Sequence, residues 1–377
     1  MPFTFDGVNP DEVFRRLLSE AQETGGPLRI IAAHDPESSA AAGLVAKILK
    51  AMDVDFEFIN DVFKIPLSDV KCLGINVPEN ICRDCVIIKS SGITACSRVG
   101  YNYVLKYTSL TKGVLSLVSE LEFITRDFKL TAAAAMLTKH TPRMVRGELS
   151  NSEAELLSSL VNEGLVSVEE GPPLIGWDPS NPCKALTTSI DVLIPSKFMR
   201  KCGEGASVEE AALEVKADPA RFRSKIYLVK GRWVSKDLIM AAYMMDWLTD
   251  VYGASAVFLT MINQAYLRLA AAGIMRMMST LRDVIDNLGR YGRVGVSGRK
   301  YLIVDDVNPT QFSATVAEKS IRSAGLIGDE RLVIKHEGRF YVPASTLPQS
   351  VRMDLASRDV SVCGGYFTLR SLEELSW

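Results

Sequence analysis

Hydrophobic positions in the first hundred residues follow two patterns, helical spacing and short continuous apolar runs. Residues 11–24 carry their apolar side chains on one face and predict an amphipathic helix. Apolar runs predict strands at 28–33, 54–59, 72–77 and 86–88. Stretches rich in small residues predict helices at 40–52 and 94–107. Apolar strands that alternate with helices are typical of a parallel sheet covered on both faces, so we expect an α/β fold.

Farther along the chain, helices are followed by a second group of strands. The pattern from 110 to 170 is mainly helical, and a capped helix start is predicted at Ser150. Two long helices are predicted at 236–252 and 254–289, the second with an interruption near Gly273. After residue 290, a helix at 312–324 lies among strands predicted at 294–296, 301–304, 331–334 and 339–342.

These patterns divide the chain into three predicted parts. Residues 1–235 form a mostly parallel α/β domain, residues 236–290 form connector helices, and residues 291–377 form a small α/β domain. In a parallel sheet, ligands bind beyond the carboxyl ends of the strands. We therefore look for chemistry in the loops that follow the predicted strands.

The composition indicates a globular protein without a strongly charged partner. Of the 377 residues 47% are hydrophobic, and 43 Lys and Arg against 45 Asp and Glu leave a net charge of −2. Such a balance gives no general attraction to DNA or to an anionic membrane. Charged or polar residues interrupt every long apolar stretch, so we expect no membrane span.

The seven cysteines are interpreted as free thiols. Cys82 and Cys85 have the spacing of zinc ligands, but Cys85 opens an apolar strand, which favours burial instead. The first residues lack the pattern of a signal peptide. Together these features predict reduced thiols and a cytoplasmic location.

The loop after the first strand, residues 34–39, carries the first candidate chemistry. In one interpretation Ser38 or Ser39 caps the following helix, and Glu37 favours its positive end. In a second, the helix N-terminus binds an anion. In a third, Asp35 and Glu37 direct their carboxylates at one divalent ion.

This loop resembles the first motif of the DHH phosphoesterases, a family that includes RecJ-type exonucleases. The family begins with a strand, then Asp-x-Asp-Gly, then a helix of small residues. Asp35 matches the first Asp, Glu37 stands for the second, and Ser38 takes the place of the Gly. In archaeal RecJ-like proteins a Lys-Ala-Leu-x-x-Ser-x-Asp-Pro segment occurs later, and residues 184–195 resemble it.

The later motifs of the family are matched in position but not in chemistry. Asn76 ends a strand where the family has Asp. An apolar strand ends in Lys89, Ser90 and Ser91 where the family has Asp-His-His, and a small-residue helix is expected to follow at 94–100. Lys139 ends a helix where the family has Asp. The resemblance covers most of residues 28–235, and residues 291–377 resemble a divergent DHH-associated domain with a Gly-rich turn at 363–365.

The resemblance implies a degenerate active site. The family holds two divalent cations with Asp and His, whereas a charged Lys has no lone pair to offer a metal. We therefore expect no catalytic residue, no metal and no cofactor. We expect Lys89 and Lys139 to neutralise the remaining acids through ion pairs. The degenerate positions are Asp35, Glu37, Asn76, Lys89, Ser90, Ser91 and Lys139.

The function implied is that of an assembly subunit. The non-catalytic branch of the family is the Cdc subunit of the CMG replicative helicase. This branch implies a pseudo-nuclease in archaeal DNA replication that binds GINS and, through GINS, the MCM helicase, with weak binding of single-stranded DNA at most. The connector methionines are interpreted as core filling, with a partner-binding face as the alternative. The alternative function is an active metal-dependent single-strand exonuclease or phosphoesterase with a rearranged site.

Overall fold

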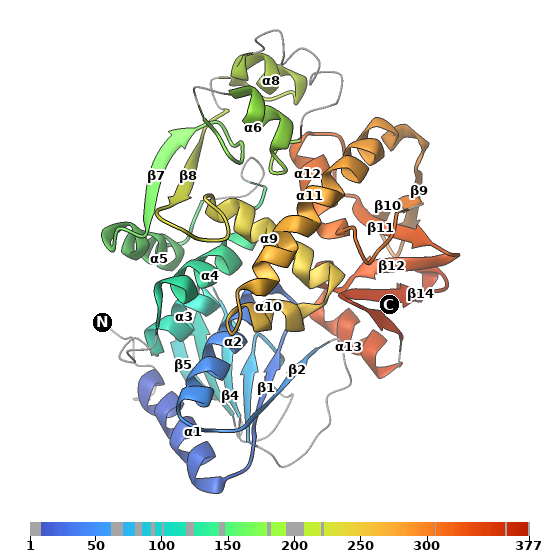
Figure 1. Cartoon of the computed structure of the whole chain (residues 1–377). Helices are drawn as coiled ribbons and strands as arrows, with labels where there is room; N and C mark the ends of the chain where they lie inside the picture. Colours follow the sequence, from blue (N-terminus) through green and yellow to red (C-terminus); the bar gives the residue numbers. More distant parts are fainter. Residues whose placement is uncertain are drawn as a thin grey trace.

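The computed structural model places two six-stranded sheets on either side of a group of helices (Figure 1). A third sheet is an antiparallel pair, β7 (Val166–Gly171) and β8 (Ser224–Val229). The residues that the structure describes are 9–61, 71–79, 85–91, 95–99, 102–117, 124–142, 148–178, 182–193, 207–219, 222–305, 307–358 and 360–375.

The N-terminal sheet is parallel except at one edge. Its strand order is β2-β1-β3-β4-β6-β5. Its strands are β1 (Leu28–Ala32), β2 (Phe56–Asn60), β3 (Cys72–Ile75), β4 (Val86–Ser90), β5 (Ala95–Val99) and β6 (Asn102–Tyr107). All neighbours run parallel except β5 and β6, which form an antiparallel pair at the edge. The expected α/β fold with a mostly parallel sheet is confirmed here.

Small side chains let the covering helices pack closely. α2 (Pro36–Ala51) contacts α4 (Arg126–Leu137), and their alanines at 40–42 and 132–135 are fully buried. Gly43 of α2 meets α10 (Ala254–Thr260), where a Cβ atom would lie 2.6 Å from a backbone oxygen. α1 (Pro10–Thr24) and α3 (Leu110–Leu117) also contact this sheet.

One buried helix, α9 (Leu238–Val251), connects the parts of the molecule. Every residue of α9 except Met240 is buried, and the helix contacts α4, α10, α11 (Ala265–Asp286) and α12 (Ala314–Ser323). Shorter elements nearby are η1 (Thr138–His140), α5 (Asn151–Asn162), α6 (Pro182–Thr188), α8 (Val208–Glu214) and η3 (Leu288–Arg290). No helix in the described part of the chain is long and apolar enough to cross a membrane.

The C-terminal sheet is mostly antiparallel, with strand order β13-β14-β12-β11-β10-β9. Only β10 and β11 pair in parallel, and α12 connects them. Its strands are β9 (Gly292–Val296), β10 (Arg299–Asp305), β11 (Arg331–His336), β12 (Arg339–Pro343), β13 (Val362–Cys363) and β14 (Tyr366–Leu369). The small C-terminal α/β unit expected from the sequence is present. α13 (Gln349–Ser357), η4 (Ala344–Thr346) and η5 (Leu372–Leu375) complete it.

The helix predicted over 94–107 is wrong, because the described residues of this segment form the hairpin of β5 and β6. Small residues at 94–97 suggested a helix, but Tyr103, Val104 and Tyr107 favour a strand. Val104 is fully buried, and Asn102 is held by its own side chain, whose oxygen accepts from the Cys85 backbone N–H at 2.9 Å. Tertiary pairing with β4 decides the conformation.

Two helix boundaries also differ from the prediction. α2 begins at Pro36, four residues early, because Asp35 caps it. The interruption predicted near Gly273 is wrong, since α11 is continuous and the break lies at residues 261–264. Gly273 instead allows close contact with Trp247, whose ring would lie 2.2 Å from a Cβ atom at this position.

The prediction of free thiols is wrong for three cysteines, two of which lie in the core of the N-terminal sheet. Cys72 and Cys85 form a disulfide between β3 and β4. The parallel register pairs Leu73 with Val86, so the two preceding residues lie side by side. Cys183 is also disulfide-bonded, whereas Cys363 is a free thiol.

A buried ion pair fastens α13 to the N-terminal sheet. Asp61 follows β2 and is fully buried, and Arg352 of α13 is 8% exposed at its side chain. The guanidinium donates to both carboxylate oxygens, with Nη2 2.7 Å from Oδ2 and Nε 3.0 Å from Oδ1. The His34 backbone N–H donates to the same carboxylate, and Gln349 of α13 donates to Asp61 and to the Asn76 backbone oxygen. α13 therefore closes over the carboxyl ends of β2 and β3.

Replacing Arg352 by methionine should lower the free energy of unfolding by about 3 to 5 kcal/mol, because Asp61 would stay buried without its counter-charge. Urea unfolding followed by circular dichroism measures the change. The matched control is Arg358→Met at the C-cap of the same helix, whose partner Asp354 is about as exposed as Arg358 itself. That pair should contribute less than about 1 kcal/mol. Equal losses in the two variants would contradict the structural role of Arg352.

Candidate functional site

A cleft of about 400 Å³ lies where the carboxyl ends of the N-terminal strands face α12. Four of the seven positions singled out in the sequence line it, namely Asp35, Asn76, Ser90 and Lys139. The opposite wall comes from the C-terminal part of the chain, with Thr315, Glu318, Lys319, Arg322, Arg331 and Ser345. The site predicted at the sheet edge is thus a cleft between two parts of the molecule.

Asp35 uses its carboxylate to begin α2. Its backbone is extended, and its side chain accepts from the Ser38 backbone N–H at 2.8 Å and from the Ser38 hydroxyl at 2.6 Å. Pro36, which has no N–H to satisfy, occupies the first helical position. The prediction that this loop caps the helix is therefore correct, but the capping residue is Asp35 and not Ser38 or Ser39.

Glu37 is buried beneath the cleft and caps a second helix. Its carboxylate accepts from the Ser109 hydroxyl and the Leu110 backbone N–H, both at 2.8 Å, and from the Thr111 backbone N–H at 3.3 Å. These donors form the N-terminus of α3, where the helix dipole favours a negative charge. Glu37 is 1% exposed and therefore faces α3 rather than the cleft.

Lys139 supplies the counter-charge for Glu37. It follows α4 in η1, and its ammonium forms an ion pair with the second oxygen of Glu37. Burial opposes the charge, but attraction by Glu37 and by the more distant Asp35 outweighs it and raises the pKa of Lys139. The ion pair expected for Lys139 is present, and the ammonium also lies 3.4 Å from the Ser90 hydroxyl.

The ion pair expected between Lys89 and the two acids is wrong. The Lys89 ammonium lies 3.3 Å from Glu79 instead. Side chains alternate along a strand, so Lys89 and the cleft-lining Ser90 of β4 point to opposite faces. Ser91 directly follows the strand, and its backbone N–H donates to the Tyr107 carbonyl.

Asn76 lies in the cleft with a left-handed backbone. Its φ of 54° follows directly after β3, a conformation that Asn tolerates better than most residues. Its backbone N–H donates to Ile88, and its carbonyl accepts from Gln349 of α13. Asn76 therefore connects the sheet edge to the C-terminal part of the chain.

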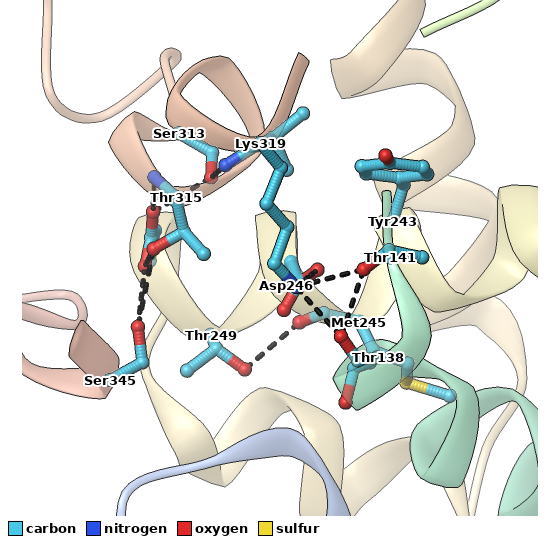
Figure 2. Close-up of polar contacts among 12 residues, drawn as sticks. Thr138, Thr141, Tyr243, Met245, Asp246, Thr249, Ser313, Thr315, Lys319 and Ser345 are labelled. Carbon is cyan, nitrogen blue, oxygen red and sulfur yellow. Dashed lines mark hydrogen bonds and ion pairs between the residues drawn. The ribbon is translucent and has the colours of Figure 1, made fainter. Parts of the chain in front are cut away.

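Lys319 crosses the cleft and was not singled out in the sequence (Figure 2). Its ammonium donates to the Thr138 carbonyl and the Thr141 hydroxyl at 2.9 Å, and to Asp246 at 2.6 Å. One cation thus joins α12, η1 and α9. No local pattern around Lys319 could have identified it, because its three partners lie 73 or more residues away.

Asp250 lies one turn after Asp246 in α9 and organises a second polar cluster. Its buried carboxylate accepts from the Ser313 hydroxyl at 2.7 Å, the Thr315 backbone N–H at 2.8 Å and the Ser345 hydroxyl at 3.3 Å. Burial raises the pKa of Asp250 to about 6, although these hydrogen bonds act in the opposite direction.

The Gly-rich turn at 363–365 packs against the same end of α9. The Gly365 backbone N–H donates to the Asp250 carbonyl at 2.7 Å. A Cβ atom on Gly365 would lie 1.8 Å from the Thr249 carbonyl oxygen, and one on Gly364 would lie 2.3 Å from that of Val251. The two glycines are required here by the close approach of two backbones.

The donor set of the cleft does not fit the pair of divalent cations that the resemblance implies. The described residues contain no group of three or more His, Cys, Asp and Glu side chains placed to hold a metal ion. Asp35 is bound to Ser38, and the Lys139 ammonium occupies the space beside Glu37. The three acidic and four basic side chains of the lining are largely paired with each other or with Glu37.

Comparisons with known proteins bear on the fold. No protein-family model matches the sequence, and the search of curated proteins found no significant match. Among solved structures, CDC45 from Entamoeba histolytica aligns with a TM-score of 0.60 at 9% identity, over 95% of this chain and 94% of that chain. RecJ in complex with Mn2+ from Thermus thermophilus aligns with a TM-score of 0.41 at 10% identity, over 95% of this chain and 51% of that chain. The chain therefore has a fold similar to that of this CDC45 structure, and the mixed α/β architecture with a mostly parallel N-terminal sheet agrees with the expected fold class.

Protonation of Asp250 should make the free energy of unfolding of the protein depend on pH. Its folded pKa of about 6 lies above the usual value of 3.8, so the folded state binds this proton more tightly than the unfolded state. The stabilisation is therefore complete below about pH 4 and is lost as the pH rises through 6. Relative to Asp250→Asn, the wild-type protein should lose up to about 3 kcal/mol of unfolding free energy over this range.

Urea unfolding of both proteins between pH 4 and about pH 7 measures this difference. Asp53→Asn, at an exposed position after α2, controls for the removal of one charge. If the difference in unfolding free energy between wild type and Asp250→Asn stays constant with pH, the raised pKa of Asp250 is contradicted.

Proposed function

We propose that this protein is a non-catalytic, RecJ-like subunit that works with a replicative helicase in DNA replication. The observation that carries the proposal is the position of Glu37. A phosphoesterase of this architecture needs carboxylates free to hold metal ions, whereas Glu37 caps α3 and pairs with Lys139. The likeness to CDC45, which extends over nearly the whole length of both chains, agrees with such a role.

The more specific form of the proposal names the partners. We place the protein in an archaeal, cytoplasmic complex of the CMG type, bound to GINS and through GINS to the MCM helicase. In this proposal residues 1–235 form the DHH-like domain, 236–290 the connector and 291–377 the DHH-associated-like domain. These assignments rest on the sequence resemblance and on the likeness of the fold to CDC45.

The charges of the molecule favour protein partners over nucleic acid. The net charge is −2, and the cations that line the cleft are already engaged by acids. A phosphate backbone would have to compete with these intramolecular ion pairs. We therefore propose that single-stranded DNA is bound weakly at most.

The purified protein should not hydrolyse single-stranded DNA, RNA or small phosphodiesters in the presence of Mn²⁺ or Mg²⁺. The reason is the engagement of Asp35 and Glu37 with α2, α3 and Lys139. Release of labelled nucleotides is the measurement. Activity that belongs to the protein itself would be lost in Asp35→Ala and kept in Asp53→Ala, a control at an exposed position. The activity of a contaminating nuclease would be the same in both variants. Metal-dependent turnover that survives in Asp53→Ala and disappears in Asp35→Ala would establish the alternative, an exonuclease or phosphoesterase with a rearranged site.

The protein should co-elute with the GINS complex of its own source in size-exclusion chromatography, and with MCM once GINS is present. If the molecule has no catalytic activity, the simplest function for it is to bind other proteins through its surface. Mixtures with GINS alone, MCM alone and both together distinguish direct binding of MCM from binding through GINS. Separate elution of all components at tens of micromolar would count against the assembly role.

A further inference from the structure

The outer face of α11 combines exposed apolar and basic side chains. The inner face of α11 is buried, with Leu267, Ala270, Ile274, Met277 and Leu281 in the core. On the opposite side Leu269 is 41% exposed and Met275 is 60% exposed. Of the connector methionines, Met244, Met245, Met277 and Met278 are buried, so core filling explains these four but not Met275.

The exposed side chains form one continuous stripe. At 100° per residue, Leu269, Ala272 and Met275 follow each other in steps of about 60° around the solvent side of the helix, so the stripe winds across about 120° of its surface. The stripe from Leu269 to Met275 extends about 9 Å along the axis, at a rise of about 1.5 Å per residue. Only eight large apolar residues are strongly exposed in the described part of the chain, and two of them lie on this stripe.

The charge along the stripe has one sign. Arg268 precedes it and Arg276 follows it along the helix axis, and both fall within its arc around the helix. Both arginines are exposed, and neither has an ion-pair partner among the described residues. Residues 265–282 contain no Asp or Glu, and the first acidic residue of α11 is Asp283. Figure 1 shows α11 on the outside of the helical group, with α9 behind it. The unpaired positive charges therefore face solvent beside apolar surface.

We propose that the stripe of Arg268, Leu269, Ala272, Met275 and Arg276, here called the α11 stripe, docks an acidic amphipathic helix of a partner protein. Leucine-type side chains of the partner contact Leu269 and Met275, and flanking carboxylates pair with the two arginines. Met suits such a contact because its flexible side chain adapts to different partner shapes. The short stripe predicts a weak interaction. This inference does not depend on the proposed role in replication.

A labelled helical peptide tests the proposal with the full-length protein. The probe has leucines at positions i, i+3, i+4 and i+7 flanked by glutamates, and fluorescence anisotropy measures its binding. We expect a dissociation constant in the micromolar range, weakened at least about tenfold by Met275→Glu and by Arg276→Glu, since each variant removes a central contact. Raising the salt from about 0.05 M to about 0.5 M should also weaken binding.

Matched controls lie elsewhere on the surface. Leu213→Glu changes an apolar residue of α8 that is 64% exposed, and Arg223→Glu reverses an exposed charge near β8. Both should bind the peptide as the wild type does. All four substitutions are at exposed positions, and unchanged thermal unfolding verifies that each variant is folded.

Several outcomes would overturn the proposal. These are the absence of peptide binding, equal binding of a peptide with lysines in place of the glutamates, and equal loss of affinity in the α8 control. Sedimentation with vesicles of anionic lipid tests whether the α11 stripe binds a membrane surface instead of a protein helix. Binding of vesicles, abolished by Arg276→Glu, without binding of the acidic peptide would assign the stripe to a membrane surface. Concentration-dependent dimerisation that Met275→Glu abolishes, again without peptide binding, would assign it to a second copy of this chain.

Discussion

The buried carboxylate of Glu37 is the constraint on which the candidate site depends. A carboxylate that is 1% exposed is costly unless it is fully hydrogen-bonded and paired. Here the donors at the start of α3 satisfy one oxygen and Lys139 neutralises the other. Because Glu37 belongs to α2 and Lys139 follows α4, this one group fixes three helices relative to each other. The same contacts use the lone pairs that a metal ion would need.

A second consequence concerns the cleft. Its cations are already engaged by nearby acids: Lys319 pairs with Asp246 across the cleft, and Arg331 and Arg322 pair with Glu318. The Asp61–Arg352 pair adds a buried contact at the edge of the N-terminal sheet. A ligand would have to break such pairs before it gained any of its own. The cleft is therefore better suited to hold the two walls together than to bind a charged substrate.

Sequence reasoning succeeded where the information is local and failed where it is not. The capping box at Ser150 and the strand over 28–33 follow from neighbouring residues, and both are present. The ion pair expected for Lys89 is an exception among the local features, because alternation along β4 separates the Lys89 side chain from the cleft-lining Ser90. By contrast, three features depend on contacts between distant segments. These are the hydrogen bonds of Lys319, the capping of α3 by Glu37 and the disulfide of Cys72. No periodicity or spacing in one sequence reports such contacts.

The presence of Asp35 and Glu37 at motif positions is therefore not by itself an argument for catalysis. Each has a structural task that would favour an acid in the absence of any metal, since Asp35 caps α2 and Glu37 caps α3. Lys139 decides between the two interpretations, because an ammonium next to Glu37 stabilises the buried acid and repels a divalent cation. In this chain the two acids and the partly exposed cation beside Glu37 serve as parts of the fold. In the proposed role as an assembly subunit, the surface of the molecule rather than its cleft carries the function.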